Sequence, residues 1–71
     1  MNKPNPSLIK KYTSHKKELK FLPRYFEIFE FRNGLTDGNF HTQEETGRKF
    51  KISATRVYQI TARVEYEVEK I

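Results

Sequence analysis

The last third of the chain carries apolar side chains three or four residues apart, at Val57, Ile60, Val64 and Val68. This spacing places them on one face of a helix, so it predicts a helix over residues 54–69 with Ser53 as its N-cap. Residues 64–71 also alternate apolar and acidic side chains, which by itself is typical of a strand. Because a lone strand has nothing to pair with here, we expect helix.

A second short helix is predicted immediately before it, over residues 43–50. Thr42 and Glu45 have the spacing of a capping box, in which the Thr hydroxyl accepts from the backbone N–H three residues on and the Glu side chain reaches back. Residues 51–52 form the turn, and Gly47 is a small residue at which another helix can cross closely. Two short helices joined by a tight turn make a helix-turn-helix, whose second helix can enter the major groove of DNA.

The first half of the chain predicts two more helices. Ser7 can cap one over residues 8–20, and a second over residues 23–32 begins at a proline, which suits the first helical position. Residues 1–6 hold two Pro and two Asn and are expected to form a flexible leader. The predicted fold is therefore all-α: one small four-helix domain over residues 7–71 with a C-terminal helix-turn-helix.

The predicted core takes apolar side chains from the inner faces of these helices. Its members are Leu19, Ile28, Phe29, Phe31, Phe50, Ile52, Val57, Ile60 and Val64. The 23–32 helix has more apolar residues than one face can hold, so Tyr25 and Phe26 are either additional core or an exposed patch for a partner. His41, which precedes the capping residue, is interpreted as a surface-loop residue.

Composition and charge narrow the classes of function. The net charge of the 71 residues is +5, which suits a nucleic-acid partner, but residues 1–20 hold six Lys and one Glu, so the recognition helix itself is nearly neutral. No Cys is present, and the two His are far apart, so we expect no enzyme activity, no cofactor and no metal. No apolar run could span a bilayer, and the start lacks the apolar core of a signal peptide. A cytoplasmic protein with neither a membrane nor a small-molecule partner is expected.

The stretch GLTDGNFHTQEETGRKFKISATRVYQITAR, residues 34–63, combines these features at fixed spacing. It resembles region 4 of the bacterial sigma-70 family of RNA polymerase sigma factors. The matched positions are Gly34, Leu35, Asp37, Gly38, Thr42, Glu44, Glu45, Gly47, Arg48, Ile52, Ser53, Arg56, Val57, Gln59, Ile60, Ala62 and Arg63. So many matches are far more specific than a generic helix-turn-helix pattern. The resemblance implies a module of transcription initiation that binds the promoter −35 element and docks on the flap of the RNA polymerase β subunit.

The resemblance also implies a set of DNA-contacting residues. They are Thr42, Ser53, Ala54, Thr55, Arg56, Tyr58, Gln59 and Arg63. The family usually has Arg, Glu and Arg where this chain has Ala54, Thr55 and Tyr58, so the side chains that read guanine and cytosine are missing. Gln59 matches the family and can still pair with adenine.

Charge around the predicted reading face is mixed. Arg56 and Arg63 match positions that contact or lie near the DNA backbone, although Arg56 has an equal alternative, an internal ion pair with Glu44 or Glu45. Glu65 is expected on the same side of the helix as the reading residues, where it would repel phosphates. We therefore expect the domain alone to bind DNA weakly.

A second class of function stays open from the sequence. The chain is then a protein–protein module that binds RNA polymerase or an anti-sigma protein with little sequence-specific DNA binding. The candidate contact residues, chosen by location, are Phe21, Leu22, Tyr25, Phe26 and Phe29.

Overall fold

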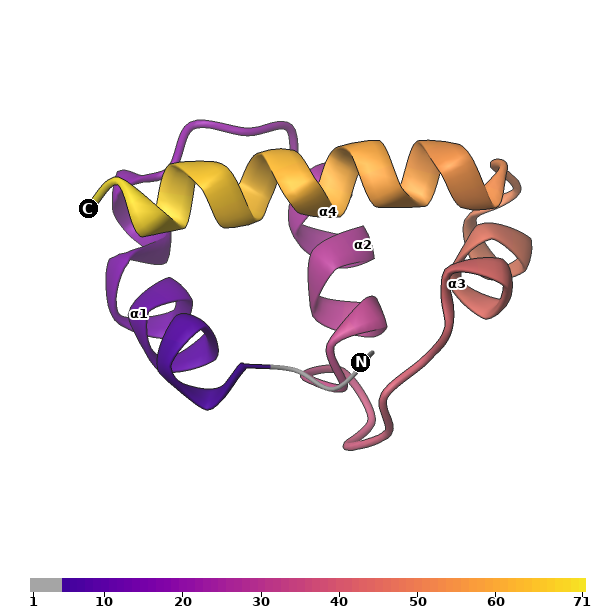
Figure 1. The fold of residues 1–71 in the computed structure, drawn as a ribbon, viewed down its shortest axis with the longest axis horizontal. Helices are drawn as coiled ribbons and strands as arrows, with labels where there is room; N and C mark the ends of the chain where they lie inside the picture. Colours follow the sequence, from indigo (N-terminus) through magenta and orange to yellow (C-terminus); the bar gives the residue numbers. More distant parts are fainter. Residues whose placement is uncertain (1–4) are drawn as a thin grey trace.

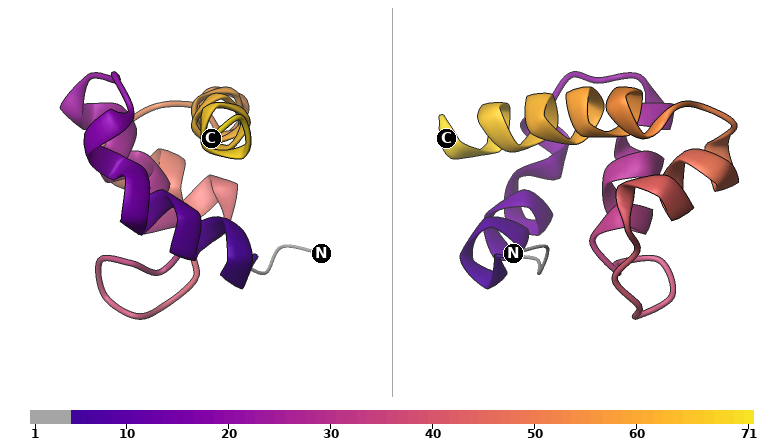
Figure 2. Two further views of the ribbon diagram at one scale, coloured as in Figure 1. Left: turned by 90° about the vertical axis from the view of Figure 1, so that its left-hand side faces the viewer. Right: turned by 45° about the vertical axis from the view of Figure 1, so that its right-hand side comes forward.

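The computed structural model describes residues 5–71, which form an all-α domain. Its elements are α1 (Pro6–His15), the short 3₁₀ helix η1 (Lys16–Glu18), α2 (Pro23–Arg32), α3 (Gln43–Phe50) and α4 (Ala54–Glu69). α4 runs the length of the molecule, with α1 against its C-terminal half, α3 against its N-terminal end and α2 between them (Figure 1). Seen end-on, α4 lies at the edge of the molecule (Figure 2). The predicted bounds of the last three helices are confirmed, and residues 5–71 contain no strand.

The start of the first helix was predicted wrongly. Its N-cap is Asn5, whose Oδ1 accepts from the backbone N–H groups of Ser7 at 3.0 Å and Leu8 at 3.3 Å. Pro6 occupies the first helical position, where its missing N–H costs nothing. The predicted leader therefore included two residues that belong to the helix and its cap, and its other four, residues 1–4, lie outside the described part of the chain.

The predicted end of that helix, at residue 20, is also wrong. α1 stops at His15, η1 follows, and the backbone is extended at Leu19, with φ −85° and ψ 135°. It is extended again at Leu22, with ψ 147°, because the residue before a proline is disfavoured in the helical conformation. The extended segment 19–22 carries the chain from α1 to the start of α2.

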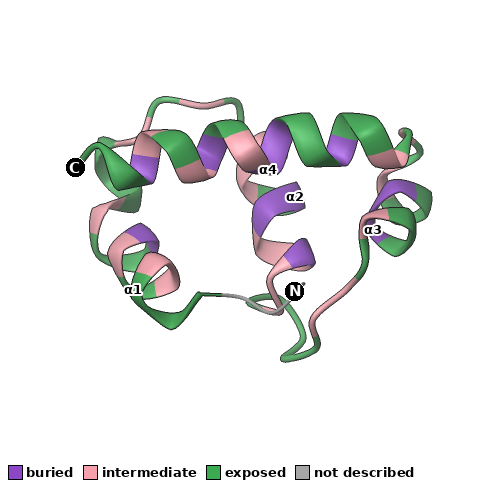
Figure 3. Ribbon diagram, viewed as in Figure 1, coloured by how far each residue is buried: buried purple, intermediate pink, exposed green. Residues whose placement is uncertain are grey.

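α4 buries its apolar stripe in two adjoining clusters. The first comprises Tyr12, Phe29, Val64 and Val68, and the second comprises Ile28, Val57 and Ile60. Figure 3 shows the buried positions on the side of α4 that faces the other helices. Of the predicted core residues, Ile28, Phe29, Val57, Ile60 and Val64 are confirmed as buried, whereas Leu19, Phe31, Phe50 and Ile52 are half-buried.

Tyr12 is a core residue that the predicted set omitted. Its ring lies 4.5 Å from that of Phe29, and its hydroxyl donates to Glu30 Oε2 at 2.6 Å. The same carboxylate oxygen accepts from Lys16 Nζ at 2.6 Å. Burial, followed by the bond to Glu30, raises the pKa of Tyr12 above its ordinary value. The buried hydroxyl is thus paired, and α1 is fastened to α2 at this point.

The turn between α3 and α4 has the local structure that the sequence predicted. The capping box is present in both directions, with Glu45 N–H donating to Thr42 Oγ1 and Thr42 N–H donating to Glu45 Oε1, each at 3.1 Å. Lys51 adopts the left-handed conformation at φ 61°, and Ile52 N–H donates to Gly47 O at 2.9 Å. A Cβ on Gly47 would lie 2.6 Å from the backbone oxygen of Ile52, so the close neighbour of Gly47 is the turn and not, as predicted, a crossing helix.

Gly47→Ala is expected to destabilise the domain even though Ala is the better helix former. Overpacking a tight contact costs about 1–3 kcal/mol, against a gain of at most about 1 kcal/mol in helix propensity. Urea denaturation followed by circular dichroism measures the difference, and Arg48→Ala, one residue further along and exposed, is the control. A Gly47→Ala protein as stable as the parent would contradict the close approach.

Candidate nucleic-acid interface

The predicted reading residues lie together on the solvent side of the first two turns of α4. Thr55, Tyr58 and Gln59 are exposed, Tyr58 to 58%, while Ala54 is half-buried. Ser53 at the start of the helix is also exposed, and its Oγ accepts from the Arg56 N–H at 3.0 Å. This face combines one amide, two hydroxyl-bearing side chains and a phenol, with no charge of its own.

Arg56 is held on one flank of this face by neutral partners. Its guanidinium donates to Tyr25 Oη at 3.2 Å and contacts Gln59 Oε1 at 3.5 Å. The ion pairs among residues 5–71 include none between Arg56 and Glu44 or Glu45, so of the two alternatives for Arg56 the internal ion pair is not formed. Among the described residues, no carboxylate pairs with the positive charge of Arg56.

Arg63 lies on the same flank, two turns further along. Its Nε is 3.6 Å from Glu67 Oε2, and its side chain is 63% exposed. An exposed pair of this length is screened by water and contributes little to stability. Arg63 is therefore available to exchange Glu67 for another anion.

The opposite flank of α4 is acidic. Glu65 is half-buried, where burial and then the neighbouring Glu69 raise its pKa while Arg32 acts in the other direction. Arg32 is itself buried, donates to His41 O at 2.6 Å and lies 4.5 Å from the ring centre of Phe40. Glu65, seven residues after Tyr58 on the same helix, thus lies partly against the body of the domain, where Arg32 attracts its carboxylate.

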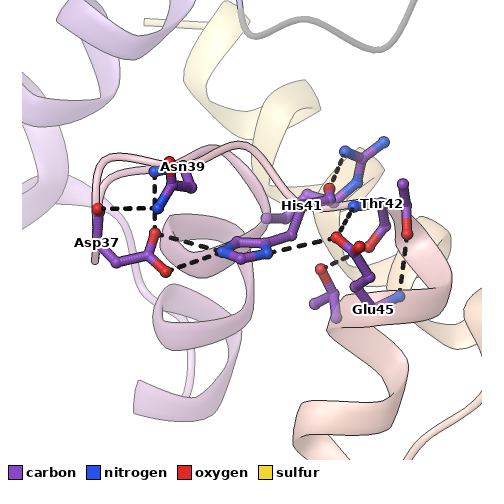
Figure 4. Close-up of polar contacts among 7 residues, drawn as sticks. Asp37, Asn39, His41, Thr42 and Glu45 are labelled. Atoms are coloured by element: carbon purple, nitrogen blue, oxygen red, sulfur yellow. Dashed lines mark hydrogen bonds and ion pairs between the residues drawn. The ribbon is translucent and has the colours of Figure 1, made fainter.

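His41, expected to be a simple loop residue, joins the loop of residues 33–42 to α3 (Figure 4). Its Nε2 lies 3.0 Å from Asp37 Oδ2 and its Nδ1 3.4 Å from Glu45 Oε1. The imidazole stacks on Phe31 with ring centres 3.9 Å apart and planes 6° apart. Because Glu45 also closes the capping box, these contacts fix the position of Thr42, the predicted backbone-contacting residue at the start of α3.

The two carboxylates around His41 are stabilised in their charged form. The pKa of Asp37 is lowered first by the Asn39 backbone N–H and then by His41. The pKa of Glu45 is lowered first by the Thr42 backbone N–H and then by His41. At both residues, a backbone N–H therefore lowers the pKa more than His41 does.

The predicted partner-binding residues are brought together, but not all are accessible. Phe29 is 0% exposed, so its assignment as a docking residue is wrong. Phe26 is half-buried between Tyr12 and Phe21, with ring centres 6.3 and 5.9 Å away, so it belongs to the packing of α1 against α2 rather than to an exposed patch. Tyr25 is half-buried and stacks on Phe21 at 5.5 Å.

Leu22 is the one member of that set that is exposed rather than half-buried or buried. It is 70% exposed and stands in the extended segment before α2. The accessible apolar surface of the predicted docking region is therefore Leu22 together with the outer edges of Phe21 and Tyr25.

Within residues 5–71, no helix is long and apolar enough to cross a bilayer. The same residues bring together no group of three or more His, Cys, Asp or Glu side chains that could hold a metal ion. Comparison with protein-family models, with curated proteins and with solved structures finds no match to the chain. The likeness of residues 34–63 to sigma region 4 accordingly stays a prediction.

Acidification is expected to loosen the junction at His41. Because the folded-state pKa values of Asp37 and Glu45 lie below their ordinary 3.8 and 4.5, their charged forms stabilise the fold above about pH 4.5, and this contribution is lost as the pH falls through the lowered values. Glu45→Gln keeps a side chain that can cap Thr42 but removes the titration. The melting temperature of Glu45→Gln should therefore fall less steeply below pH 4.5 than that of the parent.

The matched control for this experiment is Glu44→Gln, an exposed neighbour that makes no hydrogen bond to Thr42 or His41 among the described residues. Its melting temperature should follow the parent. Equal slopes in all three proteins would show that the Glu45 carboxylate has no special part in the junction.

Proposed function

We propose that this chain is a cytoplasmic, DNA-binding transcription module of the sigma region 4 type, which docks on RNA polymerase and presents α4 to the −35 element of a promoter. The observation that carries the proposal is the exposed face of Thr55, Tyr58 and Gln59 at the start of the second helix of a well-capped helix-turn-helix. A helix presented in this way can enter the major groove with its N-terminal residues against the base edges.

Base reading falls mainly to Gln59. A glutamine amide can pair with both N6 and N7 of adenine, and the methyl group of Thr55 can contact a thymine methyl. Phosphate contacts come from Thr42 at the start of α3 and from Arg56 and Arg63 on the flank of α4. With no arginine aimed at guanine, the module makes few specific contacts and binds duplex DNA weakly by itself.

Docking on polymerase compensates for weak readout. Once the module is held on a larger complex that already engages the promoter, its DNA contact becomes intramolecular, and a weak contact then suffices. Leu22 favours such docking, since a large apolar side chain that is 70% exposed beside two aromatic edges suits a protein contact. The same observation supports the second candidate function, a module that binds polymerase or an anti-sigma protein without reading DNA.

Two substitutions separate base reading from backbone contact. Gln59→Ala should cost about 1–3 kcal/mol on a preferred duplex, selected from a randomised library, and nothing on a scrambled one. Arg63→Ala should weaken both duplexes equally and lower the slope of log affinity against log salt by about one. Fluorescence anisotropy titrations measure both effects. Equal losses on the two duplexes for Gln59→Ala would refute base reading by this residue.

Leu22→Asp tests docking on polymerase. Because the side chain is exposed and occupies the N-cap position of α2, which Asp suits better than Leu, the change should not destabilise the fold, yet it should abolish co-purification with core RNA polymerase. Leu35→Asp makes the same change at a loop residue that is 41% exposed and should leave co-purification intact. If both variants retain polymerase, Leu22 is not the docking residue. Phe26→Asp is unsuitable as a test, since a charge among packed rings would unfold the domain.

A further inference from the structure

A basic groove lies between the extended segment 19–22 and one flank of α4. It has a volume of about 540 Å³, and its wall includes Lys20 and Leu22 on the segment and Arg56, Gln59 and Arg63 on the helix. None of the described residues that line it is acidic. Three cations from two distant parts of the sequence therefore meet at one site.

The charges in this groove are largely uncompensated. The ion pairs among residues 5–71 do not include Lys20 or Arg56, and Arg56 is held only by the neutral groups of Tyr25 and Gln59. Arg63 has one exposed carboxylate partner at 3.6 Å. The groove is thus complementary to a polyanion, for which each of these cations can exchange water or a weak partner.

The groove adjoins the face of α4 that carries the proposed reading residues. Gln59 belongs to both the groove and the reading face. The segment 19–22 runs alongside α4 (Figures 1 and 2). The major groove is about 12 Å wide, so a helix seated in it has a sugar-phosphate strand along each side. One of those strands would run along the flank where the three cations stand.

We propose that this groove receives the sugar-phosphate backbone of one DNA strand, with Lys20 as a phosphate contact on the wall opposite Arg56 and Arg63. The inference rests on the proposed function and adds to it a residue outside residues 34–63, the stretch on which the likeness to sigma region 4 was drawn. It also gives one of the N-terminal lysines a role beside the recognition helix. Most of the lysines lie in residues 1–20, but the fold brings Lys20 to the recognition helix, where the chain itself is nearly neutral.

The test measures duplex binding by fluorescence anisotropy between about 50 and 200 mM salt, with the whole chain and its Lys20→Ala and Lys10→Ala variants. Lys10 is an exposed lysine on α1 that does not line the groove, so it controls for the loss of one charge. Lys20→Ala should weaken binding by about three- to tenfold on preferred and scrambled duplexes alike, and it should lower the salt slope by about one. Lys10→Ala should change neither quantity appreciably.

Each other outcome is informative. If the parent binds duplex DNA and the two lysine variants behave alike, the inference fails while the proposed function stands. If the parent binds no duplex at about 50 mM salt, both fail.

A different occupant, an acidic peptide with apolar anchors, would need Leu22 as well as the cations. The amide NMR signals of residues 20 and 22 should shift on addition of duplex DNA. If they shift instead only with a helical peptide of Glu and Leu, the groove is a peptide site and the inference is overturned.

Discussion

The structure depends on the burial of one face of α4. Val57, Val64 and Val68 are fully buried there, and Ile60 nearly so. α1, α2 and α3 all pack on this helix, and no cluster of the described core lacks it. A chain of 71 residues is close to the lower limit for a self-sufficient core. Deleting methyl groups from this stripe would therefore remove a large share of the total stability.

Because α4 buries one face, its other faces are free for binding, and their charges are not alike. Arg56 and Arg63 occupy one flank, where Glu67 pairs with Arg63, whereas Glu65 and Glu69 lie toward the other. A duplex on the outer face thus meets attraction on one side of the helix and repulsion on the other. This asymmetry influences how a polyanion is oriented on α4 more than how tightly it binds, because affinity depends on the number of phosphates that are neutralised.

Local features of the sequence predicted α2, α3 and α4 to the residue, because proline, the capping box and Ser53 act through near neighbours. Features set by the tertiary structure were missed. The end of α1 at His15 depends on the path that the chain takes to α2. Which aromatic residues of α2 are core and which are surface depends on where α1 packs, so the sequence of α2 alone could not decide it. The groove beside Lys20 was equally inaccessible, since no short-range pattern relates residue 20 to residues 56 and 63. The contacts of His41 join the loop of residues 33–42 to α3, whereas hydrophobic periodicity describes each helix by itself.

In the proposed function, the contact between Arg56 and Gln59 would link phosphate binding to base reading. In the free domain, Gln59 Oε1 accepts from Arg56 at 3.5 Å, a long contact that is easily given up. Bidentate pairing with adenine requires the same oxygen to accept from N6 while the amide NH₂ donates to N7. A phosphate in the basic groove would draw the guanidinium toward itself and release that oxygen. Engagement of the backbone would therefore prepare Gln59 for the base, so that the two contacts form together rather than independently.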